Sequence, residues 1–393
     1  MKKKIFIIAG EVSGDVIGAK IINYFCHPAA PQGSHIIDSA MIAGGVGRPR
    51  DLGNKGRAVG AKQCAKFVGI GGESMKVAGL KTLFPISDLS VMGVFEVLAK
   101  SKTLLRRINE TAAAIIAEKP DIVLTIDSPS FAVRVIKKVK KKIAHCSLLT
   151  PRFYHVVAPM VWAWGPWRAK KYAKIFDKLF CFFDFEKPYF EKYGLSTIAI
   201  GHPIYDGLSK IKNKKGKIIS LVPGSRISEV KKLLPILRDV AEQLPNKKFA
   251  IPVVETTREY VSEQVRTWKV KPQIIPAAAR YKLFAESEFA IAASGTVVAE
   301  LAIIRTPTIV IYKMNPLTQI LAKLVMKTKY VSLVNILADK MIFPELLKHK
   351  ANAKNIICEI KNINPAKMKR ELAAVDKLWH KSASPTELIA RHL

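Results

Sequence analysis

A strand–turn–helix unit near the middle of the chain constrains the fold most strongly. Residues 218–222 form a short apolar run, and the turn Pro223-Gly-Ser-Arg226 follows it directly. From Ile227 onward, apolar residues recur at helical spacing. A small-residue turn between a strand and a helix presents free backbone N–H groups and the positive end of the helix dipole. We therefore expect an anion site here, with the guanidinium of Arg226 as a further phosphate ligand.

The same arrangement recurs at residues 288–304. An apolar run ends in Ser294-Gly295-Thr296, and the helical pattern that follows carries Glu300. Two such turns can hold two parts of one anionic ligand, and Glu300 is suited to accept hydrogen bonds from both hydroxyls of a ribose. Ordinary strand–helix turns with a solvated arginine are the alternative.

The length of 393 residues predicts two domains. Short apolar runs alternate with helical patterns, as parallel α/β domains require. We expect a first domain at 1–208, a second at 209–362 and a C-terminal helical segment at 363–393, with a lysine-rich linker at 212–217. Residues 27–65 and 144–152 lack a steady period and are expected to be insertions in the first domain.

The net charge of +33 suits three kinds of partner: nucleic acid, an anionic membrane surface or negatively charged substrates. A general preference for lysine explains the charge equally well. The chain has no recognisable nucleic-acid-binding motif, so we expect no nucleic acid partner. The 5 cysteines have no paired spacing, which predicts reduced thiols and no structural metal. No apolar run reaches the roughly 18 residues of a spanning helix.

The first half of the chain also carries a candidate catalytic residue. Asp127 directly follows the apolar run 122–126, and ligands of open α/β sheets bind beyond the carboxyl ends of the strands. Asp127 is therefore a candidate general base, although capping of the following helix is an alternative. The loop 10–15 follows the first strand but lacks a dinucleotide-binding fingerprint.

An apolar segment beside basic residues is a candidate membrane contact. Such a segment can enter an anionic bilayer surface, while a helix packed on the sheet is the alternative. The residues concerned are Val91, Met92, Val94, Phe95, Leu98, Arg106 and Arg107.

Short stretches along nearly the whole chain match one glycosyltransferase family in the same order. They are Ala9-Gly-Glu-Val-Ser-Gly-Asp15, Val91-Met-Gly-Val-Phe-Glu-Val-Leu98, Ile126-Asp-Ser-Pro129, Val161-Trp-Ala-Trp164, Phe185-Glu-Lys187, Gly201-His-Pro203, Pro223-Gly-Ser-Arg226 with Glu229, Ala293-Ser-Gly-Thr296 with Glu300, Pro316-Leu-Thr318, and Lys327-Thr-Lys-Tyr-Val-Ser-Leu333 with Asn335. In this ordered set the chain resembles the lipid-A-disaccharide synthases.

The resemblance implies a GT-B architecture, in which two Rossmann-like domains face a central cleft. It implies an inverting hexosyltransferase that joins UDP-2,3-diacylglucosamine to 2,3-diacylglucosamine 1-phosphate. The products are lipid A disaccharide 1-phosphate and UDP, in the lipopolysaccharide biosynthesis of Gram-negative bacteria. The enzyme is expected to be cytoplasmic and peripheral on the inner face of the inner membrane. The family's C-terminal helix returns to the first domain, and its exchange within a homodimer stays open.

The resemblance and the inverting mechanism together assign the site residues. Asp127 is expected to accept the proton of the acceptor hydroxyl, and positive groups of the protein are expected to stabilise the departing diphosphate. No DxD motif stands where a metal would bridge the diphosphate, so we expect no cofactor. The expected UDP-side residues are Gly224, Ser225, Arg226, Glu229, Ser294, Gly295, Thr296, Glu300 and Asn335. The expected acceptor-side residues are Gly10, Glu11, Ser13, Gly14, Asp15 and His202.

Several positions in the first half depart from the family pattern. Ser130 and Ala132 replace an acid and an amide, Met160 replaces a serine, and Asp184 replaces a proline. Sugar-nucleotide binding is therefore a firmer prediction than full activity. The alternatives are another GT-B UDP-sugar transferase or epimerase, a degraded basic protein at the membrane, and a non-catalytic protein that binds membrane or nucleic acid.

Overall fold

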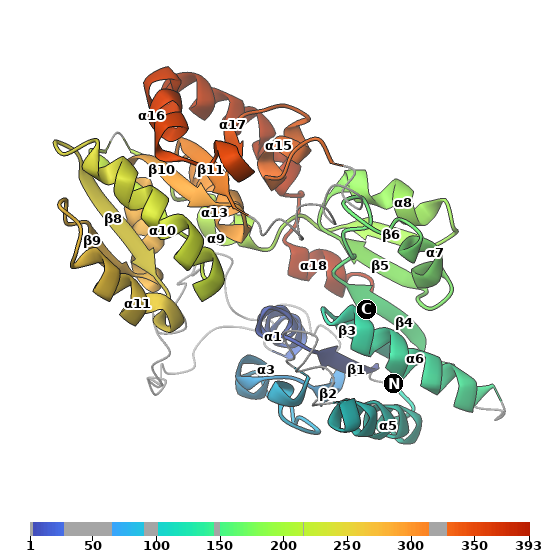
Figure 1. The fold of residues 1–393 in the computed structure, drawn as a ribbon. Helices are drawn as coiled ribbons and strands as arrows, with labels where there is room; N and C mark the ends of the chain where they lie inside the picture. Colours follow the sequence, from blue (N-terminus) through green and yellow to red (C-terminus); the bar gives the residue numbers. More distant parts are fainter. Residues whose placement is uncertain (1–2, 27–64, 90–100, 145–149, 215, 314–327) are drawn as a thin grey trace, which may run out of the picture. The chain divides into compact units, whose positions relative to one another are not determined.

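The computed structural model describes residues 3–26, 65–89, 101–144, 150–214, 216–313 and 328–393 (Figure 1). The described residues form two compact units. The first unit takes in the chain up to Pro203 and again from His380 onward, and the second runs from Ile204 to Trp379. Each unit has a parallel sheet of six strands between helices, which confirms the prediction of two Rossmann-like α/β domains.

The sheet of the first unit has the strand order β2-β1-β3-β4-β5-β6. Its central strands β1 and β3 are buried almost throughout, as strands covered on both faces are. The strands are β1 (Lys4–Ala9), β2 (Lys66–Ile70), β3 (Ile122–Ile126), β4 (Arg152–Val156), β5 (Lys178–Cys181) and β6 (Ser196–Ala199). The α-helices are α1 (Val12–Cys26), α3 (Glu73–Val77), α5 (Ser101–Glu118), α6 (Pro129–Ile143), α7 (Arg168–Ala173), α8 (Lys187–Glu191) and α18 (Pro385–Ala390).

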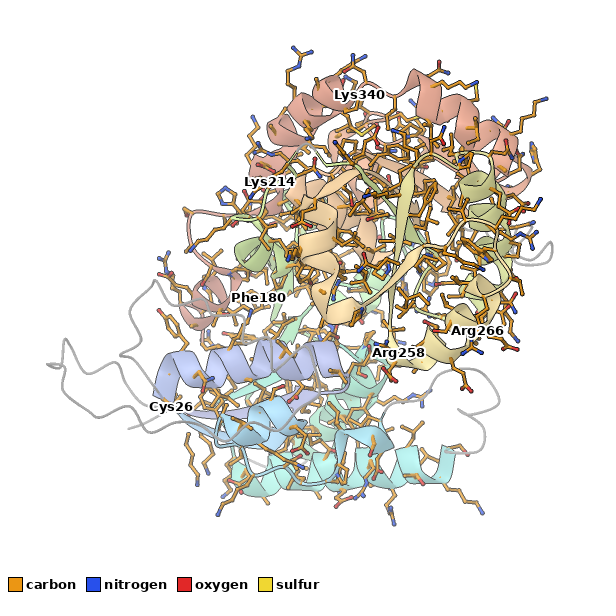
Figure 2. The ribbon with its side chains drawn as sticks, turned by 90° about the vertical axis from the view of Figure 1, so that its left-hand side faces the viewer. Cys26, Phe180, Lys214, Arg258, Arg266 and Lys340 are labelled. Carbon is orange, nitrogen blue, oxygen red and sulfur yellow. The ribbon has the colours of Figure 1, made fainter. Side chains whose placement is uncertain are left out.

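The sheet of the second unit has the order β12-β11-β10-β7-β8-β9. Its strands are β7 (Ile218–Val222), β8 (Lys248–Val253), β9 (Gln273–Pro276), β10 (Ser287–Ala293), β11 (Thr308–Tyr312) and β12 (Glu345–Leu347). Its α-helices are α9 (Ile204–Leu208), α10 (Ile227–Glu242), α11 (Glu255–Val265), α12 (Arg280–Ala285), α13 (Thr296–Ile304), α15 (Leu333–Ala338), α16 (Ala353–Asn362) and α17 (Pro365–Trp379). Charged side chains such as Arg266 and Lys340 lie at the periphery of this unit (Figure 2).

Each sheet has one point where the chain reverses its direction across the strands. In the first unit β1 pairs with both β2 and β3, and in the second unit β7 pairs with both β8 and β10. At such a switch point the loops after two adjacent strands diverge to opposite faces and leave a crevice at the carboxyl edge. The topology therefore predicts ligand sites beyond β1 and β3, and beyond β7 and β10.

The predicted linker is packed against the second unit. The side-chain nitrogen of Asn213 donates to the carbonyls of Phe284 and Ser287, each at 2.8 Å. The backbone N–H of Asn213 donates to the carbonyl of Ile304 at 2.7 Å. Residues 212–214 are thus held by the ends of α12 and α13.

The segment 363–393 is divided between the units. Helix α17 belongs to the second unit, where Leu372 is fully buried, whereas α18 belongs to the first. Ile389 of α18 is fully buried in the cluster that contains the β1 residues Ile5 and Ile7. Of the two predicted insertions, residues 27–64 and 145–149 lie outside the described residues, and β4 already begins at Arg152. None of the described helices is long and apolar enough to cross a membrane.

A buried histidine links the first unit's stability to pH. His155 of β4 is fully buried, its Nδ1 lies 2.7 Å from the hydroxyl of Thr125, and its Nε2 has no hydrogen-bond partner in the described residues. Burial lowers the pKa of His155 to about 3. Because the unfolded chain binds this proton more readily, the stabilising contribution is present above the unfolded pKa and is lost as the pH falls below it.

We predict that this histidine alone removes about 2 kcal/mol of unfolding free energy between pH 7 and pH 5. Urea unfolding at both values, for the wild-type chain and for His155→Phe, measures the difference. The variant should show a loss smaller by that amount, because phenylalanine does not titrate. His349→Gln, at an exposed position of the second unit, is the control and should keep the wild-type pH dependence. An unchanged loss in His155→Phe would contradict the prediction.

Candidate active site

Asp127 lies at the carboxyl edge of β3, where the backbone turns sharply into α6. Asp127 and Ser128 both have left-handed backbone angles, with φ of 54° and 46°. The N–H of Asp127 donates to the carbonyl of Val156 at 2.6 Å, which fixes the turn to the end of β4. One carboxylate oxygen of Asp127 accepts a hydrogen bond of 2.7 Å from the hydroxyl of Ser13. Strained non-glycine backbone of this kind concentrates at functional sites.

The glycine loop after β1 packs directly against this turn. A Cβ added at Gly10 would stand 2.1 Å from the hydroxyl oxygen of Ser128. A Cβ added at Gly14 would stand 3.1 Å from the carbonyl oxygen of Ile126. Because β1 and β3 are neighbours in register, the loop and the turn approach so closely that a Cβ at Gly10 would overlap Ser128 and a Cβ at Gly14 would crowd Ile126. The structure thus brings Gly10, Ser13, Gly14 and Asp127 together at the switch point of the first sheet.

The surroundings of Asp127 favour proton uptake. Burial raises the pKa of Asp127, while the hydrogen bond from Ser13 opposes the shift by stabilising the carboxylate. A carboxylate whose pKa is raised accepts a proton more readily than an exposed aspartate does. The geometry and the electrostatics therefore suit a general base.

In the second unit, the turns after β7 and β10 border one cavity of about 370 Å³. Gly224 has a φ of 109°, and a Cβ there would lie 2.7 Å from a carboxylate oxygen of Glu229. The turn therefore requires glycine at this position. Eight of the nine predicted UDP-side residues line the cavity, namely Gly224, Ser225, Arg226, Glu229, Ser294, Gly295, Thr296 and Glu300.

The cavity has an exposed cation at its border. The side chain of Arg226 is 68% exposed, and its guanidinium lies 3.1 Å from a carboxylate oxygen of Glu229. An exposed ion pair of this kind stabilises the fold little, so a phosphate can recruit the guanidinium at small cost. Helices α10 and α13 begin at Ile227 and Thr296, so their N-terminal N–H groups lie at the same turns.

Arg280 is a charged residue of the cavity lining that the sequence analysis missed. Its guanidinium binds the carboxylate of Glu300 through two hydrogen bonds, each of 2.9 Å. The hydroxyl of Tyr281 lies 3.3 Å from the same carboxylate. Each carboxylate oxygen has further acceptor capacity, so Glu300 is oriented by Arg280 and can still accept from a ligand. Arg280 begins a short helix with no glycine turn before it, so no motif marked it.

Comparison with known proteins identifies the family. The family model for lipid-A-disaccharide synthetase matches residues 54–384. The chain is 35% identical over 360 residues to the lipid-A-disaccharide synthase of Rhodospirillum centenum, covering 88% of this chain and 80% of that protein. It is 34% identical over 394 residues to that of Rickettsia bellii, covering 96% and 93%. The chain belongs to the lipid-A-disaccharide synthase family.

Membership of this family confirms the resemblance seen in the sequence. The chain is a glycosyltransferase of lipid A biosynthesis. Solved structures support the GT-B fold at low sequence identity. A putative UDP-N-acetylglucosamine 2-epimerase from Listeria monocytogenes aligns with a TM-score of 0.59 at 13% identity, covering 99% of this chain and 95% of that one. Spinosyn rhamnosyltransferase with thymidine diphosphate aligns with a TM-score of 0.51 at 11% identity, covering all of both chains.

Two residues predicted to contact substrate instead stabilise the synthase's backbone. Asp15 is only 4% exposed, and its carboxylate accepts from the N–H groups of Gly72, Ser74 and Met75 at 2.7, 2.9 and 3.1 Å. It therefore caps α3. Asn335 is fully buried and does not line the cavity. Its amide binds the backbone at residues 342–343 and the carboxylate of Glu345.

The remaining acceptor-side residues differ in their surroundings. Glu11 and Ser13 are exposed. The ring of His202 lies 4.7 Å from that of Phe182, measured between centroids, and burial lowers the pKa of His202 to about 4. His202 is therefore neutral at physiological pH. Neutral His202 can donate or accept a hydrogen bond but carries no charge for a phosphate.

The predicted membrane residues are only partly described. Val91, Met92, Val94, Phe95 and Leu98 lie outside the described residues. Arg106 is exposed on α5. The guanidinium of Arg107 binds Asp88 and Glu110, each at 2.6 Å, and lies 4.4 Å above the ring of Phe84. Arg107 therefore joins α5 to the preceding turn.

The departures from the family pattern occupy distinct environments. Ser130 is exposed, whereas Ala132 is 1% exposed and packs within the hydrophobic core beneath α6. Met160 is 55% exposed. Asp184 forms an ion pair with Lys381, in the segment that leads into α18. Of these four, only Ala132 lies in the core.

We predict that Arg280→Gln weakens UDP binding several-fold and lowers the unfolding free energy by about 2 kcal/mol. The reason is that the carboxylate of Glu300, at 5% exposure, would lose its bidentate partner. Calorimetric titration with UDP and urea unfolding measure the two effects. Arg258→Gln is the matched control, because Arg258 pairs with Glu255 on the surface of α11 in the same unit. Equal behaviour of the two variants would refute the role of Arg280.

Proposed function

We propose that the chain transfers a diacylglucosamine unit from UDP-2,3-diacylglucosamine to the 6-hydroxyl of 2,3-diacylglucosamine 1-phosphate. The first unit supplies the base, Asp127, and the second unit binds UDP. The observation that carries the assignment of the second unit is the cavity bordered by both strand–helix turns. Eight predicted residues from two segments some 70 positions apart in the sequence line it.

The proposed reaction is a single inverting displacement. The acceptor hydroxyl attacks the anomeric carbon, its proton passes to Asp127, and UDP leaves from the opposite face. Negative charge grows on the diphosphate as the bond breaks, so fixed positive groups lower the barrier. We assign this role to Arg226 and to the backbone N–H groups at the starts of α10 and α13. No group of three metal-binding side chains occurs among the described residues.

We assign the ribose to Glu300. Arg280 holds the Glu300 carboxylate in one orientation, and the acceptor positions that remain can receive both ribose hydroxyls. On the acceptor side, Ser13 holds the Asp127 carboxylate and the glycine loop leaves room beside it. Asp15 and Asn335 contribute indirectly, by stabilising the backbone around the sites.

We further propose that the enzyme is peripheral on the cytoplasmic face of the inner membrane. Both substrates carry acyl chains, which partition into a bilayer. The net charge of +33 favours an anionic surface, and α5 exposes Arg106 beside Leu105, which is 58% exposed. The C-terminal helix α18 packs in the first unit, and two protomers could exchange this helix. We therefore retain a homodimer as a proposal from the family resemblance.

We predict that Asp127→Asn lowers kcat by at least about a hundredfold, which is the usual contribution of a general base, and leaves UDP affinity unchanged. The assay measures UDP release from UDP-2,3-diacylglucosamine with and without 2,3-diacylglucosamine 1-phosphate, together with the disaccharide product. Near-normal turnover in Asp127→Asn would reject the base. Acceptor-independent UDP release by the wild-type chain would reject the transfer reaction itself.

Ser13→Ala provides the second arm of this experiment. The Ser13 hydrogen bond lowers the pKa of Asp127, so its removal should move the acidic limb of the kcat/KM profile to higher pH. Asp184→Asn, on the same unit but paired with Lys381, should leave that limb in place. A limb that stays fixed in Ser13→Ala would show that another group controls the reaction.

A further inference from the structure

A second cavity of about 820 Å³ lies at the amino edge of the first unit's sheet. It is bordered by residues at the starts of β1, β3, β4 and β5 and by the residues after α18. Asp127 follows the carboxyl end of β3, so the two sites lie at opposite ends of the same strands. The proposed transfer reaction does not use this cavity.

Half of the residues that line the cavity are basic. These are Lys3, Lys119, Arg152, Lys178, Arg391 and His392. Among the described residues that line the cavity, Asp121 is the only acid, and it already accepts a hydrogen bond of 2.7 Å from the N–H of Lys4. Arg391 pairs with Glu387 at 2.8 Å. In the part of the chain that the structure describes, Lys119, Arg152 and Lys178 have no acidic partner within ion-pair distance.

The positive groups raise one another's electrostatic energy. Burial lowers the pKa of Lys178, and the charges of Arg152 and Lys3 lower it further. Burial likewise lowers the pKa of His392, with the charges of Lys178 and Arg391 acting in the same direction. The Nζ of Lys178 lies 3.3 Å from the Nδ1 of His392. An anion placed among these groups would relieve the repulsion.

We propose that this cavity binds a small water-soluble anion that carries at least two phosphate charges, such as a diphosphate or a nucleotide. Arg152 and Lys178 bind the phosphate groups, and Lys3, Lys119 and Arg391 surround them. The volume falls within the range of sites for nucleotide-sized ligands. None of the large apolar side chains exposed in the described residues lines the cavity, which favours a soluble anion over a lipid.

An anion in this cavity would contact the residues that follow α18. Arg391 and His392 directly follow α18, and Ile389 and Leu393 on either side of them pack into the core with β1 and β3. An anion that contacts both these residues and Arg152 of β4 joins the C-terminal segment to the sheet. Binding therefore stabilises the docking of α18 on the first unit by mass action. This site is separate from the proposed UDP cavity.

The probe is inorganic pyrophosphate, added to the full chain and followed by amide hydrogen exchange. We expect slower exchange at residues 385–393 at low salt, and a smaller effect as salt screens the charges. The double variant Arg152→Gln/Lys178→Gln should require at least about tenfold more pyrophosphate for the same protection. Arg134→Gln/Lys137→Gln removes the same charge from the exposed face of α6 and should behave as wild type.

Thermal stability, UDP binding and a comparison with lipid vesicles separate this proposal from its alternatives. Because Arg152→Gln/Lys178→Gln removes repelling charges, its Tm without pyrophosphate should not fall, so lost protection cannot be assigned to misfolding. Both double variants should keep the wild-type affinity for UDP at the proposed UDP cavity, and Arg152→Gln/Lys178→Gln should lose only the additional binding of UDP at this second site. Equal loss of protection in both variants would indicate general charge attraction and overturn the proposal. Protection by phosphatidylglycerol vesicles but not by pyrophosphate would also overturn it, in favour of a lipid headgroup.

Discussion

The pairing of strands that are not consecutive in the chain determines where chemistry can occur in this molecule. Strand β7 pairs with β10, with Val222 opposite Ala292, although some 70 residues separate them in the sequence. This pairing brings the turns at 223–226 and 294–296 to one edge, each leading into the N-terminus of a helix. In the first unit, β1 pairs with β3 and brings the loop at 10–15 to Asp127. The backbone hydrogen bonds between these strands therefore bring the segments of each site together, independently of their side chains.

The side chains of the sites depend in turn on rigid neighbours. Asp127 has a left-handed backbone, and the surrounding structure must compensate for its cost of roughly 1–3 kcal/mol. The carbonyl of Val156 and the hydroxyl of Ser13 both hold it, and the buried residues of β3 and β4 lie beneath it. Glu300 is held in the same way by Arg280 on a different helix. In each unit, the carboxylate to which we assign a role is thus fixed by a partner distant in the sequence.

The sequence predicted the features that depend on local pattern. The apolar runs predicted the strands that end before Gly10, Asp127, Pro223 and Ser294, and their order implied parallel sheets. The role of an individual polar side chain was harder to predict. Asp15 and Asn335 were expected to bind substrate, yet both hydrogen-bond to buried backbone. The sequence around Asp15 is compatible with substrate binding and with a structural role. The two roles differ in a hydrogen-bond partner, Gly72, that lies 57 residues away along the chain.

Long-range partners also explain the residues that the sequence analysis missed. Arg280 contacts Glu300 across 20 positions, and neither a glycine turn nor a strand end marks it. Helix α18 is 6 residues long, too short for a helical period to show, although its packing on α1 and β1 defines which unit it joins. The predicted linker contains Asn213, whose amide satisfies carbonyls at the end of α12. Such contacts follow from the tertiary fold and not from the segment itself.

The high positive charge separates into groups with different physical roles. Arg107 and Arg280 are bound to carboxylates and support the structure. Arg226 is 68% exposed at the start of a helix, where a phosphate can reach it. Arg152 and Lys178 face other cations, and burial, together with the charges of Arg152 and Lys3, lowers the pKa of Lys178. A uniform preference for lysine would account for charges in contact with water. It does not account for cations gathered around a cavity whose one described acid, Asp121, already accepts a hydrogen bond, because repulsion there disfavours the folded state unless an anion offsets it.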